Sequence, residues 1–315
     1  MSPDNVQPTA SVGRHRDLID AAWQQAQAAR VSRGETQVAP ARVGGRHFEP
    51  PGYEIQGEIH RGGQGVVYRA IQESTRRTVA VKVLHGGPLA GAGERARFER
   101  EVQILAQLKH PNIVTIHDSG SVGDTAFFVM DYIDGPTLDR FVLARELPTR
   151  DRLRLVQRVC EAVHAAHLRG VIHRDLKPSN IRVDDAGEPH VLDFGLAKAE
   201  HVELDDSDGH TPTMTGQFVG SLPWASPEQA EGRLDELDVR SDVYSLGVML
   251  YQLLTGQMPY PVGRSLRDAV NNICTVEPPS PRRVRPGLDE EISAIVLKAL
   301  RKPRESRYQS AGELA

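Results

Sequence analysis

Two short stretches decide the fold: one is His173-Arg174-Asp175-Leu176-Lys177-Pro178-Ser179-Asn180, and the other is Asp193-Phe194-Gly195. Asp175 and Asn180 lie on a predicted loop, and Asp193 follows the β-like pair Val191-Leu192. Amide and carboxylate oxygens such as those of Asn180 and Asp193 suit Mg²⁺, which usually binds one or two carboxylates together with substrate phosphates. Asp175 would then orient an attacking hydroxyl. The two stretches therefore predict a site for phosphate chemistry.

A lysine upstream of these stretches needs a partner. Lys82 ends the run Val79-Ala80-Val81-Lys82, and a lysine within an apolar strand is costly unless it is paired. Glu101 lies on the apolar face of a predicted helix, beside Phe98 and Leu105. A Lys82–Glu101 ion pair would satisfy both charges and let Lys82 hold phosphate oxygens. The alternative is an edge-strand lysine that points to solvent.

A glycine-rich segment lies between two predicted strands: His60-Arg61-Gly62-Gly63-Gln64-Gly65-Val66-Val67. Glycines allow backbone N–H groups to approach a phosphate without side-chain obstruction. Taken alone, this is weak evidence, because a glycine-rich hairpin is more often just a turn.

From Tyr53 onward the sequence indicates a small β-rich part followed by a larger helical part. Five short β-rich runs, separated by glycine or polar turns as in an antiparallel sheet, cover residues 53–59, 66–72, 78–84, 113–119 and 125–132. Apolar spacing predicts helices over residues 94–108 and 151–168. Residues 241–254 are apolar on nearly all sides, which is typical of a buried helix. Residues 310–315 look like the start of a helix, so we expect the last helix to be truncated.

Residues 1–52 are expected to form a flexible N-terminal tail, because they are rich in proline, glutamine, alanine and arginine. Within them, residues 17–30 place Ile19, Trp23 and Ala26 on one side of a predicted helix. One interpretation is a mobile tail with a transient helix. The other is a docking or autoinhibitory segment anchored by Trp23.

The composition excludes several classes of protein. The 315 residues are 39% hydrophobic and 25% charged, as in an ordinary globular protein with a sizeable core. Lys and Arg total 38 against 42 Asp and Glu, and the net charge of −4 disfavours a general nucleic-acid binder. The two cysteines form no metal or redox motif and fit a reducing compartment. No apolar stretch within residues 1–315 approaches the roughly 20 residues that span a bilayer.

Taken in order, these motifs resemble those of the eukaryotic-like (Hanks-type) serine/threonine protein kinases, and of the bacterial type in particular. The resemblance covers residues 53–315. It implies an α+β, bilobal fold with a small β-rich N-lobe that carries one helix and a larger, mostly helical C-lobe. The implied boundaries are residues 53–130 for the N-lobe, 131–134 for the hinge and 135–315 for the C-lobe.

The resemblance implies a role for each motif residue. Lys82 would hold the α- and β-phosphates of ATP and pair with Glu101. Asp175 would be the catalytic aspartate, and Lys177, in the form seen in serine/threonine kinases, would contact the transferred phosphate. Asn180 and Asp193 would be the Mg²⁺ ligands. The remaining ATP-binding residues would be Gly62 and Gly65 over the phosphates; Ile59, Val67 and Ala80 as the roof; Met130 as the gatekeeper; Asp131 and Ile133 of the hinge; and Arg182 on the floor.

Further residues would support this machinery. Asp242 would brace the catalytic loop, and Glu228 would pair with Arg307. The residues that resemble the stack linking the lobes of active kinases are Leu105, Ile116, His173 and Phe194.

The resemblance also implies regulation by autophosphorylation of the segment between Asp193 and Glu228. Thr213 and Thr215 lie where bacterial relatives place their phosphorylated threonines, and Thr211 is a further candidate. A phosphate needs basic partners, for which Arg174, Lys198 and Arg97 are available. The alternative is that these threonines are polar loop residues only.

Three positions depart from the family pattern. His60 stands where the loop has its first glycine, Arg182 replaces an apolar floor residue, and Ser221 replaces a threonine of the substrate loop. An arginine plane can stack on an aromatic ring, so Arg182 either is tolerated or weakens ATP binding.

The expected function is that of a non-specific serine/threonine protein kinase that uses ATP and Mg²⁺ on protein substrates. The alternatives are a pseudokinase scaffold, to which only His60 and Arg182 point, and a small-molecule phosphotransferase, which the long segment before Ser226-Pro227-Glu228 disfavours. We expect a cytoplasmic kinase domain and no nucleic-acid partner. The sequence leaves open a transient homodimer for autophosphorylation and a membrane anchor beyond residue 315.

Overall fold

The computed structural model describes residues 42–43, 46–62, 65–84, 100, 102–123, 125–194, 220–261 and 265–315. The chain divides into two units, residues 1–40 and 41–315, and every described residue belongs to the second. The helix predicted over residues 17–30 and the candidate phosphorylation sites therefore lie outside the described residues.

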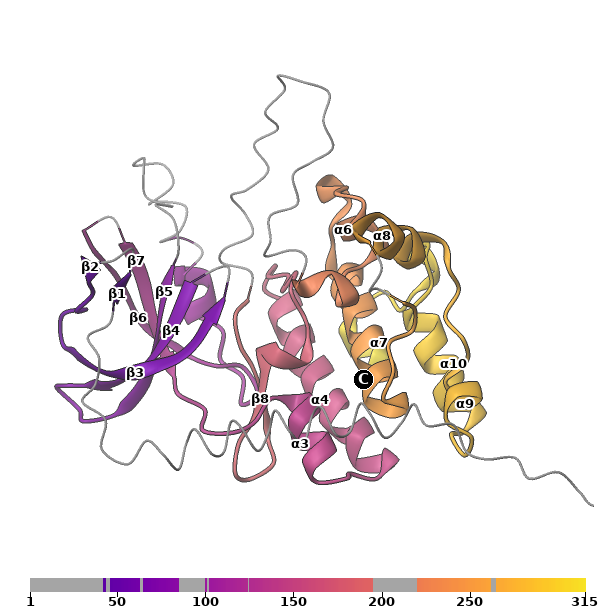
Figure 1. Cartoon of the computed structure of the whole chain (residues 1–315), viewed down its shortest axis with the longest axis horizontal. Coiled ribbons are helices and arrows are strands. Elements are labelled where there is room, and N and C mark those ends of the chain that lie inside the picture. The colour runs from indigo at the N-terminus through magenta and orange to yellow at the C-terminus, as the bar shows by residue number, and fades with distance from the viewer. Residues whose placement is uncertain are drawn as a thin grey trace, which may run out of the picture. The chain divides into compact units, whose positions relative to one another are not determined.

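A five-stranded antiparallel sheet forms the N-lobe, with the strand order β3-β4-β5-β7-β6 (Figure 1). Its strands are β3 (Tyr53–Gly62), β4 (Gly65–Gln72), β5 (Thr78–Leu84), β6 (Ile116–Val122) and β7 (Thr125–Asp131). The short pair β1 (Arg42–Val43) and β2 (Arg46–His47) precedes it. Alternation along β5 sends Val79, Val81 and Val83 to one face of the sheet and Ala80 and Lys82 to the other.

The two faces of the sheet carry separate cores. The outer core contains Phe48, Val66, Tyr68 and the three valines of β5, and Phe48 is only 3% exposed. The ring of Phe48 lies edge-on to Phe127, with centroids 5.8 Å apart. The packed part of the chain therefore starts before Tyr53, inside the stretch expected to be tail. The cleft-side core, on the other face, contains Ala80, Phe128 and Met130.

One predicted strand is displaced. The run at residues 113–119 was expected to be a strand, but β6 covers Ile116–Val122. Ile113 instead forms a parallel bridge with Val191, and the N–H of Val114 donates to the Val191 carbonyl at 3.1 Å. The N–H of Val191 in turn donates to the carbonyl of Asn112 at 2.8 Å. Residues 112–114 therefore bond to the C-lobe before the sheet resumes.

Helices form most of the C-lobe, as predicted. Its longer helices are α3 (Leu138–Ala144), α4 (Thr149–His167), α7 (Val239–Thr255), α8 (Leu266–Thr275) and α10 (Glu290–Ala299). The short helices are α6 (Pro227–Ala230), α9 (Pro281–Val284) and α11 (Ala311–Leu314), with 3₁₀ turns at 178–180, 222–224, 234–236 and 304–306. A hairpin of β8 (Ile181–Val183) and β9 (Pro189–Val191) packs on α4. Residues 100 and 102–106, within the helix predicted in the N-lobe, are helical.

Helix α7 is the buried centre of the C-lobe and contacts both α4 and α10 (Figure 1). The Asp238 side chain caps its first turn by accepting from the N–H of Arg240 at 2.8 Å. Gly256 ends it with φ +74°, a left-handed conformation that glycine adopts without strain. This explains why the helix predicted over 241–254 stops where it does.

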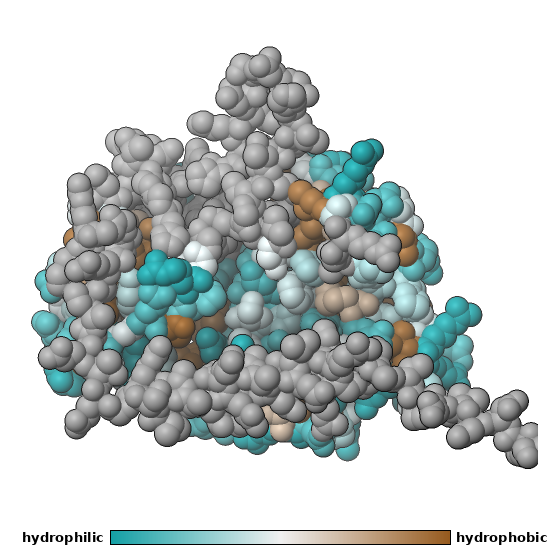
Figure 2. Space-filling model, viewed as in Figure 1, coloured by the Kyte–Doolittle hydropathy of each residue, from teal (hydrophilic) through white to brown (hydrophobic). Residues whose placement is uncertain are grey.

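The surface seen in Figure 2 is mainly hydrophilic among the described residues, with small separate hydrophobic areas. No described helix has both the length and the apolar character needed to cross a membrane. Cys160 and Cys274 form no disulfide.

Candidate active site

One buried carboxylate, that of Asp242, fixes the backbone of the loop at residues 173–180. Asp242, on α7, accepts hydrogen bonds from the backbone N–H of His173 at 2.8 Å and of Arg174 at 2.9 Å. The same carboxylate bonds the ring of His167 at 2.8 Å. Asp242 is 1% exposed, so these bonds offset the cost of burying its charge. The predicted bracing role of Asp242 is confirmed.

Arg174 takes a left-handed backbone conformation, with φ +64°, which costs a non-glycine residue about 1–2 kcal/mol. Two contacts hold it there: the bond to Asp242, and a bond from the side-chain amide of Gln229 to the Arg174 carbonyl at 2.9 Å. Sequence reasoning missed Gln229. Its signal was the pattern Ser226-Pro227-Glu228-Gln229, which forms a capping box at the start of α6.

Two side chains of the loop, Asn180 and Lys177, contact the carboxylate of a third, Asp175. The Asn180 amide nitrogen lies 3.1 Å from Asp175 Oδ2 and also donates to the Asp175 carbonyl at 2.8 Å. Lys177 Nζ lies 3.1 Å from the same Oδ2 and donates to the Ser221 hydroxyl at 2.8 Å. Asp175 and Asn180 are buried, at 8% and 9% exposure. The loop therefore holds an acceptor, an amide and a cation within one small cluster.

Lys82 and Asp193 form the second cluster. Lys82 Nζ lies 2.8 Å from Asp193 Oδ1, and both side chains are largely shielded from solvent. Asp193 has φ +55°, so a second non-glycine residue near the site is left-handed. Glu101, the partner predicted for Lys82, lies outside the described side chains. Lys198, Thr213 and Thr215 also lie outside the described residues.

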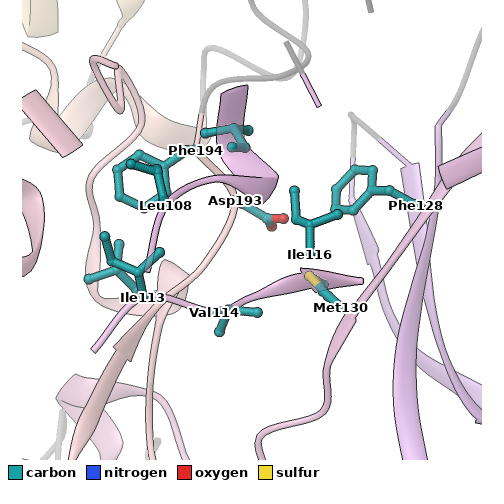
Figure 3. Close-up of a pocket in the computed structure, with 10 residues that line it drawn as sticks. Leu108, Ile113, Val114, Ile116, Phe128, Met130, Asp193 and Phe194 are labelled. Atoms are coloured by element: carbon teal, nitrogen blue, oxygen red, sulfur yellow. The ribbon is translucent and has the colours of Figure 1, made fainter. Parts of the chain in front are cut away.

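A recess opens beside Asp193, behind Met130, and its lining includes Leu105, Ile116 and Phe128. Figure 3 shows Asp193 pointing toward Met130, Ile116 and Phe128 across this recess. The rings of Phe194 and His173 lie 4.7 Å apart, and Leu105 and Ile116 line the same recess. Three residues of the predicted stack, Leu105, Ile116 and Phe194, therefore line one recess, and the fourth, His173, lies against Phe194.

The residues predicted to surround adenine also come together. Ile59, Val67 and Ile133 pack against the cleft-side core that contains Ala80 and Met130. The Asp131 N–H donates to the Thr115 carbonyl at 3.1 Å, and its side chain bonds Arg77 and His117. The N–H and the side chain of Asp131 are therefore already engaged within the protein.

Gly135 and Arg182 join the hinge to β8. A Cβ placed on Gly135 would lie 1.8 Å from the Val183 carbonyl oxygen, so only glycine allows this approach. Arg182 donates to the Gly135 carbonyl at 2.8 Å. The guanidinium of the unusual floor residue is thus held at the hinge.

Asn180 and Asp193 fit Mg²⁺. Because the Asn180 amide nitrogen donates to Asp175, its oxygen faces away from that carboxylate. An amide oxygen and a carboxylate form the small, oxygen-only protein donor set that Mg²⁺ accepts when substrate phosphates complete its shell.

The predicted pair of Glu228 and Arg307 is also present, with two bonds of 2.8 and 2.9 Å. Burial alone would raise the pKa of Glu228, but the bonds from Arg307 hold it below its usual range.

Comparison with known proteins shows the family of the chain. The chain matches the protein kinase domain family over residues 53–314. It belongs to that family. Its bilobal α+β architecture is the kinase fold, as the sequence predicted. It is 38% identical over 267 residues to the serine/threonine-protein kinase PknB of Mycobacterium leprae, covering 83% of this chain and 42% of that protein.

A second curated relative is the serine/threonine-protein kinase pkn3 of Myxococcus xanthus, 40% identical over 268 residues, with 82% of this chain and 48% of that protein covered. The chain thus spans less than half the length of either relative. Among solved structures, the PknI kinase domain of Mycobacterium tuberculosis superposes with a TM-score of 0.64 at 26% identity, covering 87% of this chain and 97% of that one.

Proposed function

We propose that this chain is an ATP-dependent serine/threonine protein kinase that transfers the γ-phosphate of Mg-ATP to hydroxyls of protein Ser and Thr residues. The observation that carries the proposal is the cluster in which Lys177 and Asn180 both contact Asp175 Oδ2. It places a proton acceptor beside a cation, which is the pair that a hydroxyl attacking a phosphate requires.

The roles follow from these positions. Asp175 accepts the proton of the substrate hydroxyl and orients its oxygen. Lys177, held between Asp175 and Ser221, stabilises the negative charge of the transferred group. Lys82 positions the phosphates from the sheet, beside Asp193. Asn180 and Asp193 would hold Mg²⁺, which supplies charge neutralisation on the phosphate oxygens when bound.

Autophosphorylation at Thr213 or Thr215, recognised by Arg174 and Lys198, is part of the proposal. Its support is the fixed backbone of Arg174, which Asp242 and Gln229 hold within the loop at residues 173–180. A phosphate on the segment would bring a charge of about −1.5 to −2 to this arginine.

The test is transfer of phosphate from γ-labelled ATP with Mg²⁺, followed by mass-spectrometric mapping of the labelled sites. Wild type should label itself at Thr213 or Thr215 and label generic protein substrates, whereas Asp193→Asn should label neither. Asp184→Asn is the matched control, because this carboxylate bonds His190 in the β8–β9 hairpin. Absence of label with wild type on every substrate would contradict the proposal and favour a pseudokinase.

A mixing experiment tests whether two copies react with each other. Tagged Asp193→Asn protein is incubated with untagged wild type and labelled ATP. Label on the tagged copy would show transfer between copies, and label on wild type alone would show transfer within one chain.

A further inference from the structure

A β-bulge in β3 turns the side chain of His60 toward the cleft. The register between β3 and β4 shifts between Glu58 and His60. Glu58 pairs with Tyr68, which belongs to the outer core, whereas His60 pairs with Val67, which packs on the cleft side. Ile59, between them, also packs on the cleft side. Since bulges re-aim side chains, two consecutive residues of β3 face the nucleotide site.

The pairing places His60 in one row with Lys82. Val67 pairs with Lys82 on β5, and Lys82 pairs with Phe128 on β7. Directly paired residues share a face, so His60, Val67, Lys82 and Phe128 form a row across four neighbouring strands. Two strand spacings separate His60 from Lys82, about 10 Å. The row runs along the cleft side of the sheet.

The imidazole extends along the strand toward the glycine turn. His60 Nε2 would lie 3.2 Å from a Cβ placed on Gly62, which pairs with Gly65 at the end of the hairpin. Gly62 and Gly65 are the glycines expected to cover the phosphates. The ring therefore reaches the part of the roof under which a phosphate chain would pass.

The charges around the ring belong to the same cleft. Burial lowers the pKa of His60, the Asp193 carboxylate opposes that effect, and Arg182, Lys82 and Lys177 add to it. On its own strand, Arg61 and Glu58 bond to each other at 3.1 Å and pair with residues of the outer core. A negatively charged ligand among these cations would favour the protonated imidazole.

We propose that His60 is an additional nucleotide-binding residue, whose imidazole donates a hydrogen bond to the phosphate chain of the nucleotide from the roof of the cleft. A glycine at this position would offer only its backbone. The proposal rests on the proposed function, because it takes the nucleotide to lie between the glycine turn and Lys82. It assigns a positive role to one of the two residues that favoured a pseudokinase.

The test compares Kd values of the full chain for Mg-ATP, Mg-ADP and adenosine by calorimetry. His60→Ala should weaken Mg-ATP and Mg-ADP on the order of tenfold, the worth of a charge-assisted hydrogen bond, and leave adenosine unchanged. His60→Gln keeps a neutral donor and should lose less. Arg61→Gln is the matched control, because it removes a neighbouring charge from the opposite face and should change none of the three.

A pH series separates contact from mere packing. The ratio of the His60→Ala to the wild-type Kd for Mg-ATP should be larger at pH 6 than at pH 8, because only the imidazolium carries the charge. Equal Kd values for the two proteins, or an equal loss with adenosine, would overturn the proposal for His60. Wild type that binds no Mg-ATP would instead overturn the proposed function itself.

Discussion

The ammonium nitrogen of Lys82 lies 2.8 Å from a carboxylate oxygen of Asp193, so an ion pair joins β5 to the segment that follows β9. The lysine is 5% exposed. Strand β5 places Lys82 on the cleft side of the sheet, where a buried cation needs an anionic partner. The Asp193 carboxylate, which belongs to the other lobe, is that partner. The pair thus places in one contact the cation proposed to bind phosphate and the carboxylate proposed to hold Mg²⁺.

Removing this cation should lower activity more than stability. In Lys82→Met, we expect kcat/KM for ATP to fall on the order of 10²–10³-fold, as when one preorganised charge stabiliser is lost. Lys109→Met is the control, because Lys109 is exposed and lies outside the cleft. Initial rates with labelled ATP give the answer, and equal rates for Lys82→Met and wild type would contradict the assigned role.

Asp242→Asn should weaken the hydrogen bonds that hold the backbone of the loop at residues 173–180. An amide cannot accept from His173, Arg174 and His167 together, so the free energy of unfolding should fall by about 2–4 kcal/mol. Because Arg174 also loses the bond that holds its left-handed backbone, kcat should fall as well. Urea denaturation and initial rates measure both quantities. Asp238→Asn, which retains a helix-capping side chain, serves as the comparison and should change neither by much.

Breaking the buried ion pair of Glu228 and Arg307 should be costly from either side. Glu228→Ala leaves a buried guanidinium without its carboxylate, so we expect a loss of about 3–5 kcal/mol in the free energy of unfolding. The double variant Glu228→Leu with Arg307→Met removes both charges and should lose less. A double variant that is less stable than Glu228→Ala would refute this account.

The same pair makes stability depend on pH. The folded pKa of Glu228 is depressed, so the contribution of its charge is complete above the unfolded pKa of about 4.3 and declines as the pH falls through the folded value. The difference in stability between wild type and Glu228→Gln should therefore be largest near neutral pH and shrink in acid. Denaturation midpoints at pH 7, 5 and 3 would show this trend. A constant difference would contradict it.

Gly135→Ala should damage the hinge. Its Cβ would collide with the Val183 carbonyl, so the chain must shift where the hinge crosses β8. We expect a loss of about 1–3 kcal/mol, typical of overpacking, together with a higher KM for ATP. Gly57→Ala is the matched control, since nothing lies within 4 Å of a Cβ there. Thermal midpoints measure the loss of stability, and ATP titrations measure the change in KM. Equal values for Gly135→Ala and Gly57→Ala would contradict the prediction.

Local patterns predicted much of this molecule. The β-rich run of β5, the apolar periodicity of α4 and the nearly all-round apolar character of α7 predicted those elements closely. The motif order correctly brought Asp175, Lys177 and Asn180 into one cluster. The bounds predicted for β6 were wrong at both ends. Ile113 bonds a residue from the other lobe, and local sequence patterns carry no information on such distant pairing.

The positioning residues were harder to predict for the same reason. His167 and Gln229 act through single hydrogen bonds to Asp242 and to the Arg174 carbonyl, across long separations in sequence. The bulge in β3 was also invisible, because it depends on which residue of β4 faces His60. Such relationships depend on three-dimensional neighbours rather than on local preference.

The bonds between residues 112–114 and β9 define a pivot for the molecule. The hinge connects the lobes covalently and follows β7. The hydrogen bond between Val114 and Val191 connects them a second time, just before β6 begins. Both attachments leave the sheet at the same side, where β7 and β6 are neighbours. If the lobes rotate, a line through these two points is the natural axis, and β3, about 14 Å from β7, lies farther from it than the other strands. Such a rotation would have to break the Lys82–Asp193 ion pair, and it would displace the glycine turn at the end of β3 more than the strands beside the hinge.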